Sequence, residues 1–280
     1  VFWFGLIAII YLFTRPRSEL GISIPLFIGG IFIVWYIAIG TIWSPYYQIH
    51  LFKLQNSEGY GISVNGIGHQ TLNPVENKEN FYFRVYELLD DEHTPENALV
   101  IGAGSGSDVA IALEQGVQHI TAVEIDPKIY QIGLELHPDK PYNDPRVEVV
   151  IQDGRYFLNE TNEKYDLIIF ALPDSLTLTS GFSSLRLESF LLTTEALAAA
   201  RDQLSDDGVL VLYNYYREDW LIYKLAGMLE TTFGEMPYVT TYGAFGRAAV
   251  LLSGPGLNLM PDLVNAPYDC LLYTSPSPRD

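Results

Sequence analysis

The stretch ALVIGAGSGSD, Ala98–Asp108, decides the fold of this chain. A short apolar run ends in three alternating glycines, Gly102, Gly104 and Gly106, and an acidic residue follows them. This pattern predicts a buried strand that turns sharply into a helix. Because the glycines leave the turn without side chains, a ligand can lie against the backbone and the helix N-terminus. We therefore expect a ligand site directly after this strand.

A carboxylate follows at the end of the second predicted strand. Glu124, in the segment VEID, comes about 20 residues after the glycine run, the spacing at which a doubly wound fold binds a ribose. A dinucleotide site usually has the pattern G-x-G-x-x-G, whereas the pattern here is G-x-G-x-G. The shorter pattern indicates a nucleoside without a pyrophosphate, such as S-adenosylmethionine or a relative. For the glycines alone a simple tight turn is the alternative, and the correctly spaced acid argues against it.

Predicted strands and helices alternate from Ala98 onward. The predicted strands span residues 98–102, 120–124, 147–151, 167–171 and 209–213, and the predicted helices span residues 107–115, 127–136, 194–204 and 219–233. Residues 239–242 and 247–252 are expected to form a closing antiparallel pair. This order predicts the α/β class, with a doubly wound, mostly parallel, Rossmann-like sheet of the S-adenosylmethionine-dependent methyltransferase type.

Four residues stand at or just after the ends of these strands: Gly102, Glu124, Asp153 and Asp174. Ligands of open α/β sheets bind at the carboxyl ends of the strands. We therefore expect these residues to converge on one crevice.

Composition excludes several function classes. The formal net charge is −18 and no basic stripe is visible, which argues against nucleic acid as a partner. The five histidines are scattered without metal-ligand spacing, so no metal site is predicted. A single cysteine, Cys270, excludes an intrachain disulfide framework.

The N-terminal region is predicted to be membrane-embedded. Val1–Phe13 is almost entirely apolar, and Gly21–Trp43 is an uncharged run of 23 residues, long enough to cross a bilayer. A buried core helix is the alternative. Arg15 and Arg17 precede the second run and only Lys53 follows it closely, which would place the following domain outside the cell. A nucleoside cofactor made inside cells requires the reverse, and we favour a cytoplasmic domain at a bacterial inner membrane.

The chain divides into four predicted parts. These are a truncated membrane region (1–43, one partial and one full helix), a small β unit (44–96), a nucleoside-binding α/β domain (97–255) and a tail (256–280). The β unit is predicted from alternating apolar and polar residues with turn signals at Asn56-Ser57 and Asn65-Gly66. Cys270–Asp280 reads as an artefact of translated adapter sequence, with a genuine disordered tail as the alternative.

A series of motifs resembles the spermidine synthase (polyamine aminopropyltransferase) family, including its membrane-anchored forms. The motifs are WSPYYQ (43–48), VNGIGHQ (64–70), VIGAGSGSD (100–108), VEID (123–126), DPRVEVVIQDGR (144–155) and KYDLIIFALPD (164–174). The resemblance covers about residues 43–233, and it rests on the order and spacing of the series rather than on one motif.

The resemblance implies roles for individual residues. Gln48 would contact the cofactor, the loop from Gly102 to Gly106 would line its sulfonium tail, and Glu124 would accept both ribose hydroxyls. Asp153 with Gly154 would face the adenine amino group. The structural alternatives are an ordinary strand polar residue for Gln48, as for Gln70, and a turn or helix cap for Asp153 and Gly154.

The half of the site that would bind the amine departs from the family pattern. The general base that the family places at the end of the fourth strand is Ala171 here, and the acid of its glycine loop is Ser105. The tyrosine and acid of its Y-x-E segment align with Phe83 and Val85. Removing a general base costs roughly 10²–10⁴ in rate. Asp174 is the candidate substitute base, with a loop cap as the alternative.

The resemblance therefore implies a transferase that uses decarboxylated S-adenosylmethionine, or S-adenosylmethionine, as co-substrate, with aminopropyl transfer to a small amine as its reaction and a homodimer as its assembly. One alternative is a methyltransferase acting on a substrate other than a polyamine. The other is a membrane protein that binds a nucleoside without catalysis, because a fold alone does not decide a function.

Overall fold

The computed structural model describes residues 5, 7, 10, 20–54, 59–89, 93–171, 191–216, 219–242, 248–260 and 263. The chain forms two compact units, Val1–Ile42 and Trp43–Asp280. Several sequence predictions fall wholly or partly outside the described residues. They are the apolar run Val1–Phe13, the charges of Arg15 and Arg17, the turn at Asn56-Ser57, the candidate base Asp174, the start of the strand predicted at 247, and the segment from Cys270 that was interpreted as an artefact.

The first unit contains helix α2 (Leu20–Ala38), which includes Pro25. Its large apolar side chains are exposed, among them Leu26, Phe32 and Trp35. A membrane-crossing helix was predicted here. Over the residues that can be described, however, no helix is both long and apolar enough to span a bilayer.

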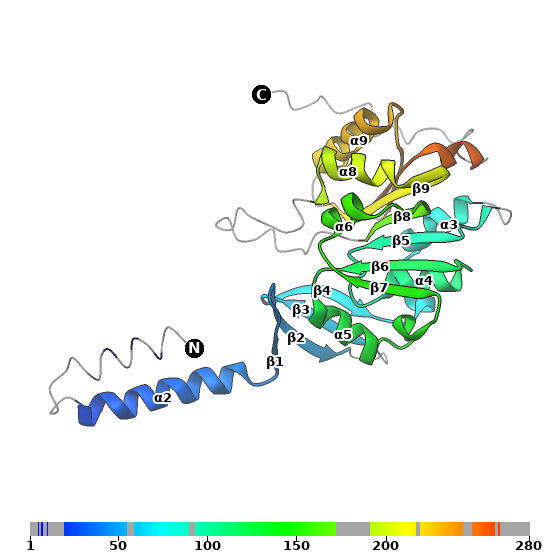
Figure 1. Ribbon diagram of the computed structural model, residues 1–280. Helices are drawn as coiled ribbons and strands as arrows, with labels where there is room; N and C mark the ends of the chain where they lie inside the picture. The colour runs from blue at the N-terminus through cyan, green and yellow to red at the C-terminus, as the bar shows by residue number, and fades with distance from the viewer. Residues whose placement is uncertain are drawn as a thin grey trace, which may run out of the picture. The chain divides into compact units, whose positions relative to one another are not determined.

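A seven-stranded sheet forms the centre of the second unit (Figure 1). Its order is β10-β11-β9-β8-β5-β6-β7. The strands are β5 (Asn97–Ile101), β6 (His119–Glu124), β7 (Val147–Ile151), β8 (Tyr165–Ala171), β9 (Leu204–Tyr215), β10 (Tyr238–Tyr242) and β11 (Ala248–Ser253). The first five in the chain pair in parallel, and β10 and β11 close one edge as an antiparallel pair. The predicted mostly parallel, doubly wound sheet is therefore confirmed.

Two apolar clusters cover the two faces of this sheet. Alternate residues of each strand enter different clusters, so that Val100 packs on one face and Leu99 and Ile101 pack on the other. On the first face lie α3 (Arg84–Leu88), α4 (Ser107–Glu114) and α5 (Pro127–Leu136). On the second face lie α6 (Gly154–Glu160), α8 (Thr194–Asp202) and α9 (Asp219–Phe233). Helices on both faces leave the carboxyl ends of the strands open for a ligand.

A smaller antiparallel sheet precedes this domain, as predicted. Its strands are β2 (Gln48–Lys53), β3 (Tyr60–Val64) and β4 (Ile67–Leu72), while β1 (Thr41–Trp43) spans the boundary between the two units. The register of β3 with β4 shifts after Ile62, which pairs with Gln70, while Ser63 pairs with Gly68. His69 is thus an extra residue, a β-bulge, and bulges re-aim neighbouring side chains.

Several short elements were not predicted from the sequence. They are η1 (Val75–Asn77), η2 (Asn80–Phe83), α3, η4 (Pro141–Asn143), α6 and η5 (Pro255–Leu259). The predicted tail from residue 256 is corrected in part, because η5 packs on β9 and Met260 is fully buried in the core. Elements of this length depend on tertiary packing more than on hydrophobic periodicity, since isolated short helices are unstable.

Candidate active site

One cavity of about 390 Å³ lies at the carboxyl ends of β5, β6 and β8. Its lining includes Ile101, Gly102, Glu124 and Ala171 from these strand ends. The position is the topological switch point of the sheet, because the chain leaves β5 toward β6 on one side and β8 pairs on the other. Its size is that of a small-molecule site.

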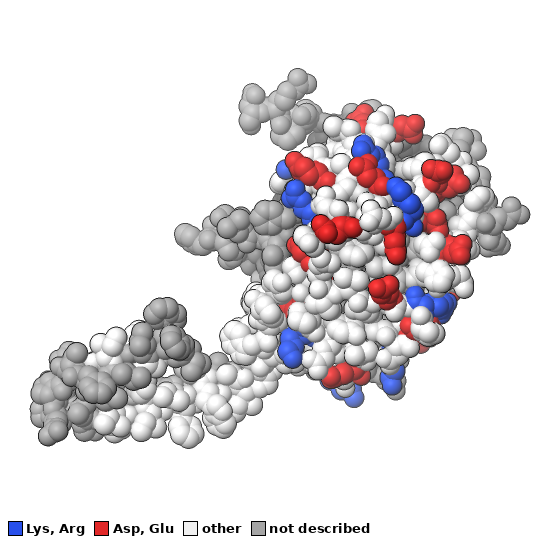
Figure 2. Space-filling view, in the orientation of Figure 1, with Lys and Arg blue, Asp and Glu red and all other residues white. Residues whose placement is uncertain are grey.

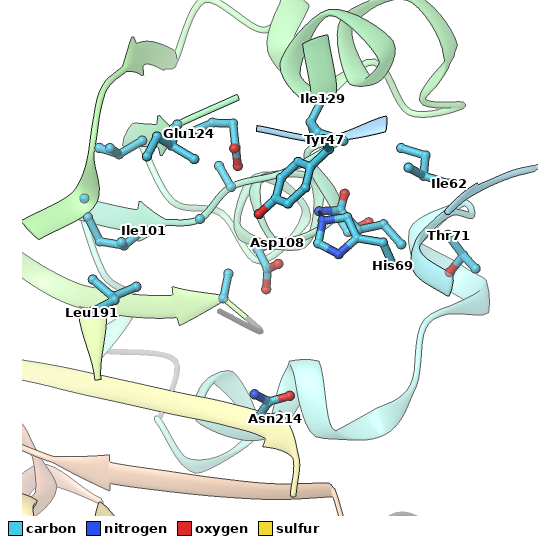
Figure 3. A pocket seen from close by; sticks show the side chains of 18 of the residues that line it. Tyr47, Ile62, His69, Thr71, Ile101, Asp108, Glu124, Ile129, Leu191 and Asn214 are labelled. Atoms are coloured by element: carbon cyan, nitrogen blue, oxygen red, sulfur yellow. Dashed lines mark hydrogen bonds between the residues drawn. The ribbon is translucent and has the colours of Figure 1, made fainter. Parts of the chain in front are cut away.

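The carboxylate of Glu124 is held by backbone groups at the edge of this cavity (Figure 3). One oxygen accepts a hydrogen bond from the N–H of Gly104 at 2.7 Å, and the other accepts one from the N–H of Asp126 at 2.8 Å. The residue is only 7% exposed, and burial raises the pKa of its carboxyl to about 7. The N–H of Ile125 also interacts with this carboxylate. An ionised carboxylate has about four acceptor positions, so the group can still accept hydrogen bonds from a ligand hydroxyl.

The glycine loop takes the sharp turn that was predicted. Gly102, Gly104 and Gly106 all have positive φ, at 77°, 57° and 97°. A side chain at Gly104 would meet the amide of Gln70 at 2.5 Å. Gly102 lines the cavity, whereas Gly104 and Gly106 shape the turn beside it. Their proposed contact with a sulfonium tail stays a prediction.

Asp153 has the capping role that was weighed as its alternative. Its Oδ1 accepts a hydrogen bond from the N–H of Tyr156 at 2.9 Å, and it is the N-cap of α6. Asp153 and Gly154 also line the cavity, together with apolar side chains of Ile101 and Ile125. Because capping uses only one carboxylate oxygen, the residue remains available for a ligand amino group. That second role stays a prediction.

Tyr47 lines the cavity, whereas its neighbour Gln48, the first residue of β2, is not among the lining residues. The contact of Gln48 with the cofactor stays a prediction. The N–H of Gln48 donates to Asn65 at 3.1 Å.

Two adjacent residues of β4, His69 and Gln70, both line the cavity. The β-bulge at His69 makes this possible, since neighbours on a regular strand point to opposite faces. Gln70 supports the glycine loop, because its Oε1 accepts a hydrogen bond from the N–H of Ser105 at 2.9 Å. The sequence analysis weighed Gln70 only as an ordinary strand residue.

Ala171 and Ser105 stand at the positions where the family has acids, and the surroundings of these two residues differ. Ala171 lines the cavity, so a carboxylate there would face a ligand. Ser105 is only 2% exposed, is absent from the lining, and its Oγ has no hydrogen-bond partner among the described residues. The serine hydroxyl is therefore no replacement for the lost acid.

The alignment of Phe83 and Val85 with the family's Y-x-E segment stays a prediction. Tyr82, one residue before Phe83, lines the cavity. Phe83 packs against an apolar cluster of Val75, Ala110 and Ile111, and Val85 is 2% exposed. The segment is helical, and the direction of a helical side chain depends on the exact start of the helix, which periodicity does not give.

Four charged residues of the cavity lining were not assigned a role from the sequence: Lys78, Glu79, Asp108 and Arg155. Asp108 follows the glycine loop on α4, is 8% exposed, and burial raises the pKa of its carboxyl to about 7. Lys78 donates a hydrogen bond from Nζ to the carbonyl of Thr71 at 2.8 Å, and burial lowers the pKa of its ammonium. The sequence signal for Asp108 was its place at the end of the quoted motif, two residues after the last glycine.

The surface carries both signs of charge. On the face shown in Figure 2, Lys and Arg side chains are interspersed with Asp and Glu side chains. With a net charge of −18 for the whole chain, this face does not offer the basic stripe that nucleic acid requires. No group of three or more potential metal ligands occurs in the described part of the chain.

The sheet order and the helices on both of its faces define a Rossmann-like α/β fold of the S-adenosylmethionine-dependent methyltransferase type, with a carboxylate at the end of β6 in its cavity. Residues 87–242 match the spermine/spermidine synthase domain, and the chain belongs to that family. The resemblance predicted from the sequence motifs is thereby confirmed.

Relatives and solved structures agree with this assignment. The chain is 32% identical over 139 residues to a polyamine aminopropyltransferase of Thermoplasma acidophilum, covering 48% of this chain and 49% of the relative. It is 29% identical over 176 residues to that of Thermoplasma volcanium, covering 61% and 59%. The chain thus spans about half the length of the curated relatives it matches.

The fold is similar to that of spermidine synthase crystallised with the transition-state analogue AdoDATO. The TM-score is 0.61 at 20% identity, over 79% of this chain and 76% of the other. A second similar structure is human methyltransferase-like protein 13 in complex with SAH, with a TM-score of 0.50 at 20% identity, over 67% of this chain and 92% of the other. At these identities the similarity concerns the fold alone.

Proposed function

We propose that this chain transfers the aminopropyl group of decarboxylated S-adenosylmethionine to a small amine. Its family membership and its polyamine aminopropyltransferase relatives support this reaction. The observation that carries the proposal is that one cavity combines the backbone-held carboxylate of Glu124 with a second, acidic and tyrosine-lined end around Asp108. The first suits a ribose diol, and the second suits a cationic aminopropyl group and a cationic acceptor.

The residues of the cavity fit this co-substrate. Glu124 presents two acceptor oxygens, Gly102 leaves the loop open, and Ile125 and Ile129 supply apolar surface for an adenine ring. When bound, the co-substrate supplies a sulfonium sulfur that makes the neighbouring carbon electrophilic. The chain's residues hold the ribose, orient the chain of the aminopropyl group and keep water from the reacting atoms.

The acidic end should also distinguish between the two possible co-substrates. The tail of S-adenosylmethionine carries a carboxylate that its decarboxylated form lacks. That carboxylate would lie in a cavity that holds the buried acid Asp108 and the carboxylate of Glu79, and like charges repel. We therefore expect the decarboxylated form to bind at least about tenfold more tightly, which corresponds to about 1.4 kcal/mol.

Calorimetry tests the proposal. The full chain is titrated with S-adenosylmethionine, its decarboxylated form and methylthioadenosine, and the products formed with putrescine are identified by mass spectrometry. Tighter binding of the decarboxylated form, with methylthioadenosine and an aminopropylated amine as products, supports it. Tighter binding of S-adenosylmethionine indicates methyl transfer instead, and binding of none of the three indicates a non-catalytic role.

Location and assembly are also proposals. Association with a bacterial inner membrane, with the catalytic domain in the cytoplasm, is supported by the exposed apolar side chains of α2, among them Leu26, Phe32 and Trp35. Fractionation of cells that express the chain with and without residues 20–38 tests this, and an unchanged soluble fraction contradicts it. The homodimer rests on family resemblance alone, and light scattering of the purified chain measures it.

A further inference from the structure

A second buried carboxylate faces the cavity. Asp108 is the second residue of α4 and is only 8% exposed. Figure 3 shows its carboxylate turned into the open space between the hydroxyl of Tyr47 and the amide of Asn214. Its carboxylate accepts a hydrogen bond from its own backbone N–H and is attracted by the ammonium of Lys78. It is therefore a buried carboxylate that faces the pocket, with Lys78 as its charged neighbour among the described residues.

Capping of the helix does not account for this placement. An acid in the first turn of a helix interacts favourably with the helix dipole, but an exposed acid would do so without losing its hydration. The burial of Asp108 disfavours its charged form and raises its pKa. Buried ionisable groups ordinarily have a partner. Because the attraction of Lys78 offsets the cost of burying this carboxylate only in part, its position on the cavity wall points to a ligand that brings a further positive charge.

Lys78 lies at the same end of the cavity. Its Nζ is 5.6 Å from the centre of the Tyr82 ring and donates to the carbonyl of Thr71, and its charge lowers the pKa of Asp108. The nearby Glu79 accepts a hydrogen bond from the hydroxyl of Tyr215 at 3.3 Å. The end around Asp108 thus holds two carboxylates and one ammonium.

We propose that Asp108 binds the ammonium group of the acceptor and accepts its proton, and that Lys78 limits the acceptor to one positive charge at this end. The proposal rests on the aminopropyl transfer proposed above and deepens it, because it names the base and the acceptor class. Asp108 would replace the acids that the family has at the positions of Ser105 and Ala171. The acceptor would be a monoamine, or an amine whose second charge lies outside this end.

The reaction begins with a proton transfer. The acceptor's ammonium gives a proton to the carboxylate of Asp108, and the acceptor becomes a neutral amine. Its nitrogen lone pair forms a bond to the methylene carbon beside the sulfonium sulfur, and the carbon–sulfur bond breaks with its electron pair remaining on sulfur. The products are a secondary ammonium and a neutral thioether, and Asp108 later releases its proton to water.

The surroundings of Asp108 suit a base that works near neutral pH. Its pKa lies at about 7, because burial raises it more than the positive charge of Lys78 lowers it. The other titratable groups near it are Tyr82, Tyr86 and Tyr142, whose own pKa values burial raises, so they remain neutral hydroxyls. A base is most effective when its pKa is close to the working pH.

The test uses the full chain saturated with methylthioadenosine, so that amine binding is measured apart from turnover. Butylamine and putrescine have the same carbon chain but one and two charges, and calorimetry measures both. The variants are Asp108→Asn and, as a control at the exposed end of the same helix, Glu114→Gln. We expect Asp108→Asn to weaken butylamine binding at least tenfold and Glu114→Gln to change it less than twofold. Methylthioadenosine binding should change less than twofold in both.

Lys78 is tested by the ratio of the two amines. We expect Lys78→Gln to improve putrescine binding at least fivefold relative to butylamine, whereas Lys128→Gln, an exposed control on α5, should leave the ratio unchanged. Asp108→Glu keeps the charge and should restore at least part of the amine binding. If Asp108→Asn does not fold, amine binding by Asp108→Glu is the measurement that tests the role of this residue.

The outcomes separate this inference from the proposed function. Wild-type binding of methylthioadenosine with equal amine binding by Asp108→Asn overturns the inference and leaves the proposed function standing. An unchanged ratio in Lys78→Gln overturns the part assigned to Lys78. If the wild-type chain binds no methylthioadenosine, both proposals are contradicted.

Discussion

The end of the cavity around Glu124 is built from backbone groups, whereas the end around Asp108 is built from side chains of separate segments. At the first end, the N–H groups of Gly104 and Asp126 hold the carboxylate. At the second end, Lys78, Asp108 and Asn214 come from three separate segments of the chain. Backbone geometry follows from strand, turn and glycine, so the first end depends on the fold itself. Side chains can be exchanged without altering the fold, so the second end is where specificity can change.

Of these substitutions, Glu124→Ala should weaken ligand binding most, because it removes the carboxylate at the first end of the cavity. The variant loses two charge-assisted hydrogen bonds to the ribose, which are worth about 1.5–3 kcal/mol each, so we expect methylthioadenosine binding to weaken at least about 100-fold. Calorimetry measures it. Glu148→Ala, an exposed acid on the adjacent strand, is the matched control and should bind normally. Normal binding by Glu124→Ala would mean that the ribose lies elsewhere.

The pH dependence of methylthioadenosine binding also tests the role of Glu124 at the first end of the cavity. Because the pKa of Glu124 is about 7 and its ionised form is the better acceptor, affinity for methylthioadenosine should rise by up to about tenfold per pH unit below 7 and level off above it. Glu124→Gln should show no such slope. A flat wild-type profile between pH 5.5 and 7 would contradict the assignment.

The same pKa shift predicts how stability changes with pH. The folded pKa of Glu124 lies above the unfolded value of 4.5, so the folded chain holds the proton more tightly between pH 4.5 and about 7. Its contribution to the free energy of unfolding therefore falls as pH rises through this window, and Asp108 acts in the same direction. The melting temperature of the ligand-free chain, measured with and without Glu124→Gln, isolates the contribution of this one carboxyl.

Ala171→Asp would make the second end more like that of the family. A carboxylate at this lining position adds a negative charge beside the acceptor, and we expect putrescine turnover to rise up to about tenfold, less than the roughly 10²–10⁴ that a fully positioned general base contributes. Steady-state kinetics with putrescine and butylamine measures it. An equal rise for both amines would contradict a gain that depends on the second charge.

Gly104→Ala and Gly227→Ala should change stability in opposite directions. Gly104 has a φ of 57° and a Cβ there would lie 2.5 Å from Gln70, so we expect a loss of at least about 1 kcal/mol. Gly227 lies within α9 with nothing near its Cβ position, and alanine should stabilise the helix by about 0.5–1 kcal/mol. Urea unfolding measures both, and equal effects would contradict the strained turn.

Of these substitutions, Asp153→Ser should have the smallest effect on stability and on ligand binding. A serine keeps an oxygen that can cap α6, so the melting temperature should change little, whereas Asp153→Ala should cost about 1 kcal/mol. If the second carboxylate oxygen also contacts adenine, both variants should weaken methylthioadenosine binding by a similar, few-fold factor. Binding that changes in neither variant would leave Asp153 as a helix cap only.

The sequence predicted the elements with strong periodicity. α5 and α9 begin and end where expected, and the five parallel strands occur at the predicted places. The glycine loop and Glu124 were also located, because a side-chain-free turn and a strand-end acid are local signals. The sequence alone did not locate the short helices between residues 75 and 89, since tertiary contacts rather than periodicity stabilise them.

The residues that line the cavity next to two of the predicted positions were not named from the sequence. Tyr47 lines the cavity beside Gln48, and Tyr82 lines it beside Phe83. A shift of one residue reverses the side of a strand to which a side chain points and turns it by about 100° around a helix. Sequence patterns locate elements only to within a residue or two, which is too coarse for this purpose.

The sequence by itself determined the class of sheet, the turn after β5 and the carboxylate that ends β6, because each depends on neighbours close along the chain. Only the tertiary structure decided which side chains share the second end of the cavity. Asp108, Lys78 and Asn214 meet there through strand order, a β-bulge and helix packing. Those contacts join residues far apart in the chain, and burial, which gives Asp108 its altered pKa, exists only once they have formed.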